Sequence, residues 1–342
     1  MKQLLTNRSL WLYLTGLAVT LSLPLLFTSG FARSVMILTG MFVIFALGYD
    51  LSIGHVGTVH LAAPAFFGLG AYVTALAGPA FGLNFVGVFL LSAVAMALLA
   101  FFVGIPSFRL SDVTFAIATL AFALISQLVV LNAVDITGGP LCVKGIPRPS
   151  FYLPGVSELA ITSNLQYFYL LVPLIFLTIL IYRLLTTSRI GRTFVAVRED
   201  EVLASACAVN PLRYKMLAFM VGAAIMGGLG SFQAQYITVI CPSELALDFT
   251  LRLLIIIFVG GAGSLTGVLT GAVIFTVAPE LMRSLGRLNI TPAHQLIIFG
   301  LILLLVVTYS PGGLRDILVR WYRFARGRLT ASDPKPPKAD IP

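Results

Sequence analysis

The chain has 342 residues, of which 58% are apolar and only 10% are charged, and its formal net charge is +9. A soluble domain carries about 25% charged residues, so this composition excludes a water-soluble fold. The positive charge does not indicate nucleic-acid binding, because the basic residues lie beside apolar stretches and form no basic-aromatic face. We therefore expect an all-α, polytopic helical membrane protein that contacts lipid and no nucleic acid.

Apolar stretches follow one another along the chain, and most are long enough to cross a bilayer. The first follows Lys2 and Arg8 but is not followed by a small-residue cleavage site, so an uncleaved helix is expected rather than a signal peptide. The pattern predicts about eight to ten transmembrane segments, some of them broken or re-entrant and Gly-rich. The stretches are 10–27, 34–47, 56–77, 85–104, 113–132, 167–185, 212–235, 251–278 and 292–309.

Charge predicts the orientation of these segments. If the N-terminus is cytoplasmic and the first six stretches each cross once, the basic segment at 183–215 returns to the cytoplasm. Together with Lys2, Arg8, Arg109 and the basic tail at 315–342, this segment places 16 of the 22 basic residues inside. That distribution follows the positive-inside rule, so we predict that both termini are cytoplasmic.

The stretch 251–278 is the one least expected to be a simple span. Three plain crossings would place the basic segment at 183–215 and the basic tail on opposite sides. Gly260, Gly261 and Gly263 interrupt the stretch. A broken or re-entrant helix pair there would return the chain to the side from which it came, so the basic segment and the basic tail would lie on the same side. Such breaks often lie on a transport pathway, although clustered glycines also let helices approach closely, and both interpretations stay open. A second Gly-rich region covers 54–70.

The motifs of common enzymes are absent from the sequence. It contains no Gly-x-x-x-x-Gly-Lys-Ser/Thr, no His-Glu-x-x-His and no Gly-x-Ser-x-Gly. The histidines His55, His60 and His294 are scattered. We therefore predict no catalytic residues, no metal site and no cofactor bound by this chain.

Two further features leave alternatives open. Asp50 falls well within an apolar region, and with the nearby His55 and His60 it would suit a proton-coupled carrier, although such histidines are more often hydrogen-bonded inside a bundle. Cys142 and Cys241 would both face the outside, where a disulfide is chemically possible. With so few cysteines, small unpaired apolar residues are the favoured interpretation.

The segment 186–212 is predicted to carry a short amphipathic helix on the cytoplasmic face. Glu199, Asp200 and Glu201 precede the apolar run 202–208, so acids would occupy the first turn, where the helix dipole favours them. Pro211 would end the helix. The helix would either cover the bundle or dock a cytoplasmic partner through its apolar side chains.

This segment resembles the coupling loop of the branched-chain amino acid ABC importer permeases. Other stretches are similar to the same family: GHVGTVHLAAPAFFGLGAY at 54–72, TGG at 137–139, GIP at 145–147, VGGAGS at 259–264 and PGGL at 311–314. The resemblance covers nearly the full chain. In and just after the loop, the matching residues are Ser188, Arg189, Gly191, Arg192, Arg198, Glu199, Asp200, Glu201, Ala204, Asn210, Lys215, Ala218 and Phe219.

The resemblance implies a permease domain at 1–314, closer to the M-type subunit, and a cytoplasmic tail at 315–342. It implies an importer of branched-chain or similar amino acids in the bacterial cytoplasmic (inner) membrane. Its partners would be a second homologous permease, two cytoplasmic subunits that hold ATP and Mg²⁺, and an extracytoplasmic substrate-binding protein. The coupling residues would be Gly191, Arg192, Arg198, Glu199, Asp200, Glu201, Ala204 and Asn210. The translocation pathway would include Asp50, His55, Thr58, His60, Gly68, Gly70, Gly260, Gly261 and Gly263.

The sequence departs from the family pattern in three places, one of which is Pro140-Leu141-Cys142 in place of a more polar external segment. Thr58, His60, Ala62 and Ala63 replace its usual Gln, Ser, Gly and His in the stretch expected to face the substrate, and Ala208 replaces a usual Gly in the coupling loop. A permease for urea or another small polar solute therefore stays an alternative, as does a stand-alone channel or secondary carrier.

Overall fold

The computed structural model describes residues 24, 29–153, 156–284, 300, 301, 304 and 308. Within this part of the chain, six helices are long and apolar enough to cross a membrane. Almost all of the predicted stretches 10–27 and 292–309 lies outside the described residues, as does the whole tail 315–342. The six helices are α2 (Gly30–Asp50) with its continuation η2 (Leu51–Val56), α3 (Ala63–Phe81), α4 (Phe85–Ser107), α5 (Asp112–Asn132), α7 (Asn164–Thr187) and α10 (Pro211–Ile237).

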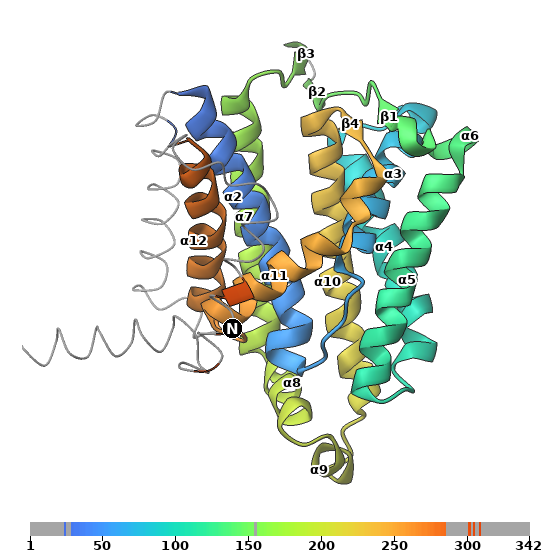
Figure 1. Cartoon of the computed structure of the whole chain (residues 1–342), viewed down its shortest axis with the longest axis vertical. Helices are drawn as coiled ribbons and strands as arrows, with labels where there is room; N and C mark the ends of the chain where they lie inside the picture. Colours follow the sequence, from blue (N-terminus) through green and yellow to red (C-terminus); the bar gives the residue numbers. More distant parts are fainter. Residues whose placement is uncertain are drawn as a thin grey trace, which may run out of the picture.

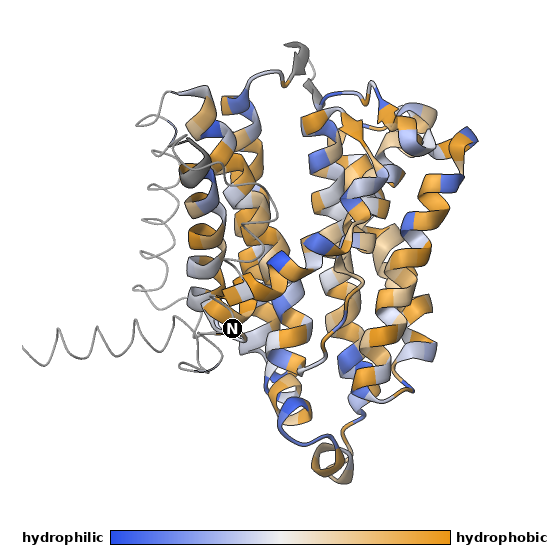
Figure 2. Ribbon diagram, in the orientation of Figure 1, coloured by the Kyte–Doolittle hydropathy of each residue, from blue (hydrophilic) through white to orange (hydrophobic). Residues whose placement is uncertain are grey.

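These helices form one bundle with α10 at its centre (Figure 1). α10 packs against α2, α3 and α4, and α2 packs in turn against α7. Figure 2 shows apolar residues on the outer surface of the bundle as well as inside it. Phe102 and Val113 are 67% and 73% exposed, and an apolar surface of this extent suits lipid rather than water. The fold is the predicted all-α polytopic membrane protein.

Short elements cap the two ends of the bundle (Figure 1). At one end lie α6 (Val134–Thr137), η3 (Gly139–Leu141), the paired strands β1 (Val143–Lys144) and β4 (Val239–Ile240), and the hairpin β2 (Ser150–Leu153) and β3 (Val156–Ala160). At the opposite end lie α8 (Arg189–Glu199) and α9 (Glu201–Ala206). Beyond α10 the chain continues through η4 (Pro242–Leu245) into α11 (Leu247–Gly260) and α12 (Leu265–Ser284).

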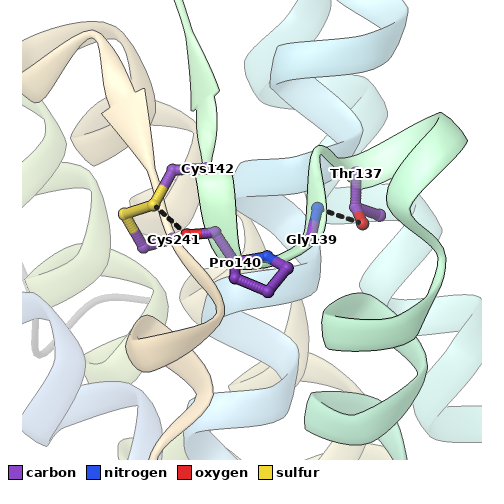
Figure 3. Close-up of a disulfide and its surroundings, with 5 residues drawn as sticks. All are labelled: Thr137, Gly139, Pro140, Cys142 and Cys241. Atoms are coloured by element: carbon purple, nitrogen blue, oxygen red, sulfur yellow. Dashed lines mark hydrogen bonds between the residues drawn. A yellow bond between two sulfur atoms is a disulfide. The ribbon is translucent and has the colours of Figure 1, made fainter.

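A disulfide joins Cys142 to Cys241 beside the β1–β4 pair (Figure 3). We call this side of the bundle the disulfide end. The antiparallel pairing of Val143 with Ile240 places the two cysteines opposite each other, although 99 residues separate them in the sequence. The favoured interpretation of unpaired cysteines is therefore wrong for this pair, because sequence spacing does not report the strand pairing.

Removing this disulfide is expected to destabilise the protein by about 2–5 kcal/mol, because the bridge closes a long loop in the unfolded chain. Thermal unfolding of the Cys142→Ser, Cys241→Ser double variant in detergent should show a lower midpoint than the parent protein. Cys207 is an exposed free cysteine, so Cys207→Ser is the matched control and should leave the midpoint unchanged. Equal midpoints for all three proteins would contradict the bridge.

Candidate functional site

The two Gly-rich breaks of the chain lie against each other. After α2 the backbone widens into the π-helix η2 and then runs without regular structure to α3. The second break, a turn between α11 and α12, confirms the interruption predicted at 260–264. The Gly263 amide donates a hydrogen bond of 2.9 Å to Asp50 Oδ1. A Cβ on Gly54 would lie 2.3 Å from the Gly263 nitrogen, so only glycine permits this approach.

The helices α11 and α12 form a hairpin that returns to the disulfide end. Glu244, just before α11, bonds to Gln233 near the end of α10, and Glu280 near the end of α12 shares a cavity with Gln233 and Ile237. The turn at Gly263 instead lies near the opposite end, beside Asp50. The hairpin therefore begins and ends toward the same end of the bundle, which agrees with the broken helix pair predicted for this stretch.

Glycines also bring the two arms of the hairpin into close contact. A Cβ on Gly260 would lie 2.4 Å from the carbonyl oxygen of Gly267, and one on Gly271 would lie 2.4 Å from that of Ile256. The glycines therefore permit a close helix contact, as one of the two sequence interpretations predicted, since Gly260 ends α11 and packs against α12. Their place on a transport pathway stays a prediction.

A buried polar network surrounds Asp50. The Tyr182 hydroxyl of α7 donates to Asp50 Oδ2 at 2.6 Å, so with the Gly263 amide the carboxylate accepts two hydrogen bonds. His55 Nε2 lies 2.9 Å from the Tyr182 oxygen and 4.0 Å from Asp50 Oδ2. A carboxyl group inside an apolar bundle requires such partners. Through them Asp50 ties α2 to α7 and to the second break.

Arg198 connects this network to α8. Its guanidinium donates to the Gly54 carbonyl of the first break, and a Cβ on Gly57 would lie 3.0 Å from Arg198 Cγ. Arg198 Nη1 also lies close to Gly263, at 3.3 Å from the position of a Cβ there. Residues that the sequence assigned separately to coupling and to the pathway are thus neighbours in the fold.

The remaining residues predicted for the pathway lie in closely packed positions within the bundle. Thr58 and His60 are buried, and the His60 ring lies edge-on to Phe219 at 4.9 Å. Gly68 and Gly70 let α3 approach its neighbours: a Cβ on Gly68 would lie 2.4 Å from Leu245, and one on Gly70 would lie 2.5 Å from a backbone oxygen of α10. Gly261 has a positive φ of 112°, which a glycine accommodates readily, and caps α11.

Two adjoining cavities open between α2 and α10 toward the disulfide end. The larger, of about 280 Å³, is lined by residues from the start of α2, the end of α10 and α12, including Ser34, Tyr236 and Glu280. The smaller, of about 70 Å³, lies deeper and has Gln233 as its one polar lining residue among those described. Of the residues that the structure describes, none of those predicted for the pathway lines either cavity.

Gln233 borders both cavities and is held by Glu244. The Gln233 amide nitrogen donates to Glu244 Oε2 at 2.9 Å. Partial burial raises the pKa of the Glu244 carboxyl above its ordinary value, whereas the hydrogen bond from Gln233 opposes that rise. Sequence reasoning missed this pair, because a glutamine inside an apolar span carries no motif.

The segment 186–212 folds into two helices rather than one. α9 begins at Glu201, and the Asp200 side chain caps it by accepting from the Leu203 amide at 2.9 Å, so the predicted acidic start is confirmed for these two residues. It was wrong for Glu199, which is the last residue of α8. α8 was not expected. The predicted end of the helix was wrong, because α9 stops at Ala206 and Pro211 is the first residue of α10, a position that tolerates proline.

The two faces of this α8–α9 unit differ in exposure. Its inner face packs Phe194, Val197 and Ala204 against Val56 of the first break and against α10. Lys215 of α10 donates to Glu201 Oε2 at 2.5 Å and holds α9 in place. Among the residues predicted for coupling, Glu201 and Ala204 therefore attach α9 to its own bundle. Gly191 permits the sharp turn from α7 into α8, because a Cβ there would lie 2.0 Å from the Thr186 oxygen.

The outer face of the unit is exposed and carries both apolar and charged side chains. Val202 and Leu203, which belong to the apolar run 202–208 predicted to cover the bundle or to dock a partner, are 81% and 63% exposed. The coupling residues Arg192, Glu199, Asp200 and Asn210 are exposed as well. Ala208 has a φ of +62°, which explains why a glycine suits this position in the family and marks a strained residue in this chain.

Comparison with known proteins identifies the family of the chain. The sequence model of the family described as "branched-chain amino acid transport system / permease component" matches residues 31–307. The high-affinity branched-chain amino acid transport system permease protein LivM of Salmonella typhimurium is 27% identical over 87% of this chain and 73% of its own. LivM of Escherichia coli is 28% identical over 81% of this chain and 68% of its own.

A more distant relative comes from an archaeon. The probable branched-chain amino acid transport permease protein LivM of Methanocaldococcus jannaschii is 24% identical over 67% of this chain and 68% of its own. No solved structure was found that matches the chain. Since the family model covers most of the sequence, this multi-pass membrane protein belongs to the family of branched-chain amino acid transport system permease components.

Proposed function

We propose that this chain is a permease subunit of an ATP-driven importer that translocates branched-chain or similar amino acids across the bacterial inner membrane. The α8–α9 unit is the observation that carries this proposal. It lies at one end of the bundle, presents exposed Val202 and Leu203, and reaches the first break through Arg198. The relatives named as branched-chain amino acid permeases support the substrate class.

The proposed orientation places the α8–α9 unit in the cytoplasm and the disulfide end outside. Disulfides form and persist in oxidising compartments such as the periplasm, which supports the outer location of Cys142 and Cys241. Arg189, Arg192 and Arg198 lie in α8, and an excess of basic residues is typical of the cytoplasmic side. Both termini would then be cytoplasmic.

In this proposal the energy comes from partner subunits. Two ATP-binding subunits holding ATP and Mg²⁺ would dock on the α8–α9 units of this chain and of a second homologous permease, and a substrate-binding protein would dock at the disulfide end. Movement of α8 would be passed by Arg198 to both breaks, because these meet at Gly54 and Gly263. The partners would thereby favour different states of the pathway in turn.

Uptake of radiolabelled leucine by the complete complex in vesicles tests this function. We expect uptake that requires ATP and the substrate-binding protein and that unlabelled valine and isoleucine inhibit. Uptake that persists without ATP would contradict the proposal. Leucine uptake by the purified chain alone, driven by a proton gradient, would instead favour a secondary carrier that uses Asp50, and inhibition by urea alone would favour a polar solute.

A further inference from the structure

The smaller cavity is enclosed mainly by phenylalanine rings. Phe42 and Phe45 come from α2, Phe67 from α3 and Phe249 from α11. Phe249 stacks on Phe42 and on Phe67 with ring centroids 5.4 Å apart in each case, and Phe45 lies 5.1 Å from Phe67. We call this space the phenylalanine pocket. Residues from helices far apart in the sequence therefore build one apolar chamber.

The size and walls of the pocket limit what can occupy it. Its volume of about 70 Å³ is roughly half that of a ~150 Å³ apolar cavity known to accept benzene. A branched aliphatic group fits such a space better than an aromatic ring. A charged or strongly polar group would lose its hydration there, because Gln233 is the one polar side chain among the described lining residues.

The mouth of the pocket has different chemistry. The phenylalanine pocket and the larger cavity share Leu38, Met41 and Gln233, so they adjoin at Gln233. A carboxylate only accepts hydrogen bonds, so the bond to Glu244 requires the Gln233 amide nitrogen to face Glu244. The other arm of the amide, the carbonyl oxygen, is then the group that Gln233 offers to a cationic donor.

The arrangement joins an apolar chamber to a larger cavity that is also mostly apolar but carries the polar side chains of Ser34, Gln233, Tyr236 and Glu280. We propose that the phenylalanine pocket binds the side chain of the transported amino acid, with Gln233 contacting its ammonium group at the mouth. This assignment rests on the proposed import function. The larger cavity, which Ser34 and Glu280 help to line, would hold the polar end of the amino acid. Glu244 acts here as a positioning residue for Gln233.

The structure favours an aliphatic amino acid over the polar alternatives. Urea is recognised through hydrogen bonds on all sides, which phenylalanine rings do not supply. Arg252 lies 5.6 Å from the Phe42 ring centre and is not among the described residues that line the pocket, and its cation–π contact helps to fix that ring. A fixed aromatic wall discriminates by shape and by volume, and a single methylene group in such a pocket is worth about tenfold or more in selectivity.

Changing the volume of the pocket from two different walls tests the assignment. Phe249→Leu enlarges it, and we expect the ratio of phenylalanine to leucine uptake by the complete complex to rise about tenfold. Leu229→Phe fills it from α10, and the ratio of alanine to leucine uptake should rise by a similar factor. Phe102→Leu is the matched control, because Phe102 lies on α4 away from the pocket and is 67% exposed.

Radiolabelled uptake of leucine, phenylalanine and alanine provides the measurement, with thermal unfolding in detergent as a check on folding. Unchanged ratios in a folded variant, or equal loss of all three amino acids, would overturn the pocket assignment. The two variants change the pocket from different helices, so if one of them does not fold, the other still tests the assignment. Failure of the unmodified complex to import leucine would count against the proposed function, whereas unchanged selectivity in a complex that imports leucine would count against the pocket only.

Discussion

Replacing Gly54 with alanine is expected to abolish transport and to lower the stability of the protein. The new Cβ would lie 2.1 Å from Asp50 Oδ1 and 2.3 Å from the Gly263 nitrogen, far inside van der Waals contact. One neighbour is a backbone atom and the other belongs to a fully buried carboxyl group that Tyr182 and Gly263 hold in place. Overpacking of this kind costs about 1–3 kcal/mol, and here it would push the two breaks apart.

The matched control for this prediction is Gly78→Ala. Gly78 also lies in a membrane-spanning helix, but the nearest atom to an added Cβ is Val88 Cγ2 at 3.7 Å, an ordinary contact. Leucine uptake by the complete complex and the thermal unfolding midpoint in detergent should fall for Gly54→Ala and stay near the parent values for Gly78→Ala. Equal uptake by the two variants would show that the contact between the breaks is dispensable.

The spans were predictable because hydrophobic length is a strong signal in membrane proteins. Each of the six long helices coincides with an apolar stretch read from the sequence. The break at 260–264 was predictable for a different reason, since counting positive charges required one segment to return. The contact of that break with Gly54 was not, because no sequence pattern links Gly54 to Gly263 across the intervening helices.

Other features had no signal that sequence reasoning could use. In α2 both faces are apolar, one toward lipid or a neighbouring helix and one toward the phenylalanine pocket, so periodicity did not single out Phe42 or Phe45. α8 was read as loop because its arginines break the apolar pattern, although its inner side carries Phe194 and Val197 at a helical spacing. The disulfide depended on a strand pair of two residues each, too short to predict.

The α8–α9 unit contains two kinds of residue: those that shape it and attach it to the bundle, and those that are exposed and available for docking. The acidic motif that made the segment recognisable includes Glu201, which pairs with Lys215 of the same chain, and Asp200, which caps α9. These residues shape the α8–α9 unit and attach it to the bundle. The apolar side chains beside them, which follow no motif, face outward. The motif therefore identified the unit, whereas the exposed Val202 and Leu203 belong to the apolar run 202–208 that follows the acidic residues.

Replacing Val202 and Leu203 together with aspartate is expected to reduce ATP-driven uptake by more than tenfold. In the proposed complex these side chains are the apolar anchors of the outer face, and loss of a central anchor costs about 2 kcal/mol or more in binding. Two carboxylates would also have to be desolvated against the partner. Because the two residues are 81% and 63% exposed, the thermal unfolding midpoint of the isolated chain should not change.

Co-purification of the ATP-binding subunit and leucine uptake are the two readouts, and Ser205→Asp is the control. Ser205 is exposed on the same short helix, so this variant adds charge without removing an apolar anchor. Ala204→Arg should behave differently from both, because Ala204 is buried against Val56 and its replacement would lower the unfolding midpoint of the isolated chain as well as uptake. Full uptake by the double aspartate variant would exclude this face as the docking surface. If the double aspartate variant instead loses uptake while its unfolding midpoint stays unchanged, the two residues act in docking and not in folding. A residue that holds α9 on the bundle, such as Ala204, cannot be changed without lowering both uptake and the midpoint.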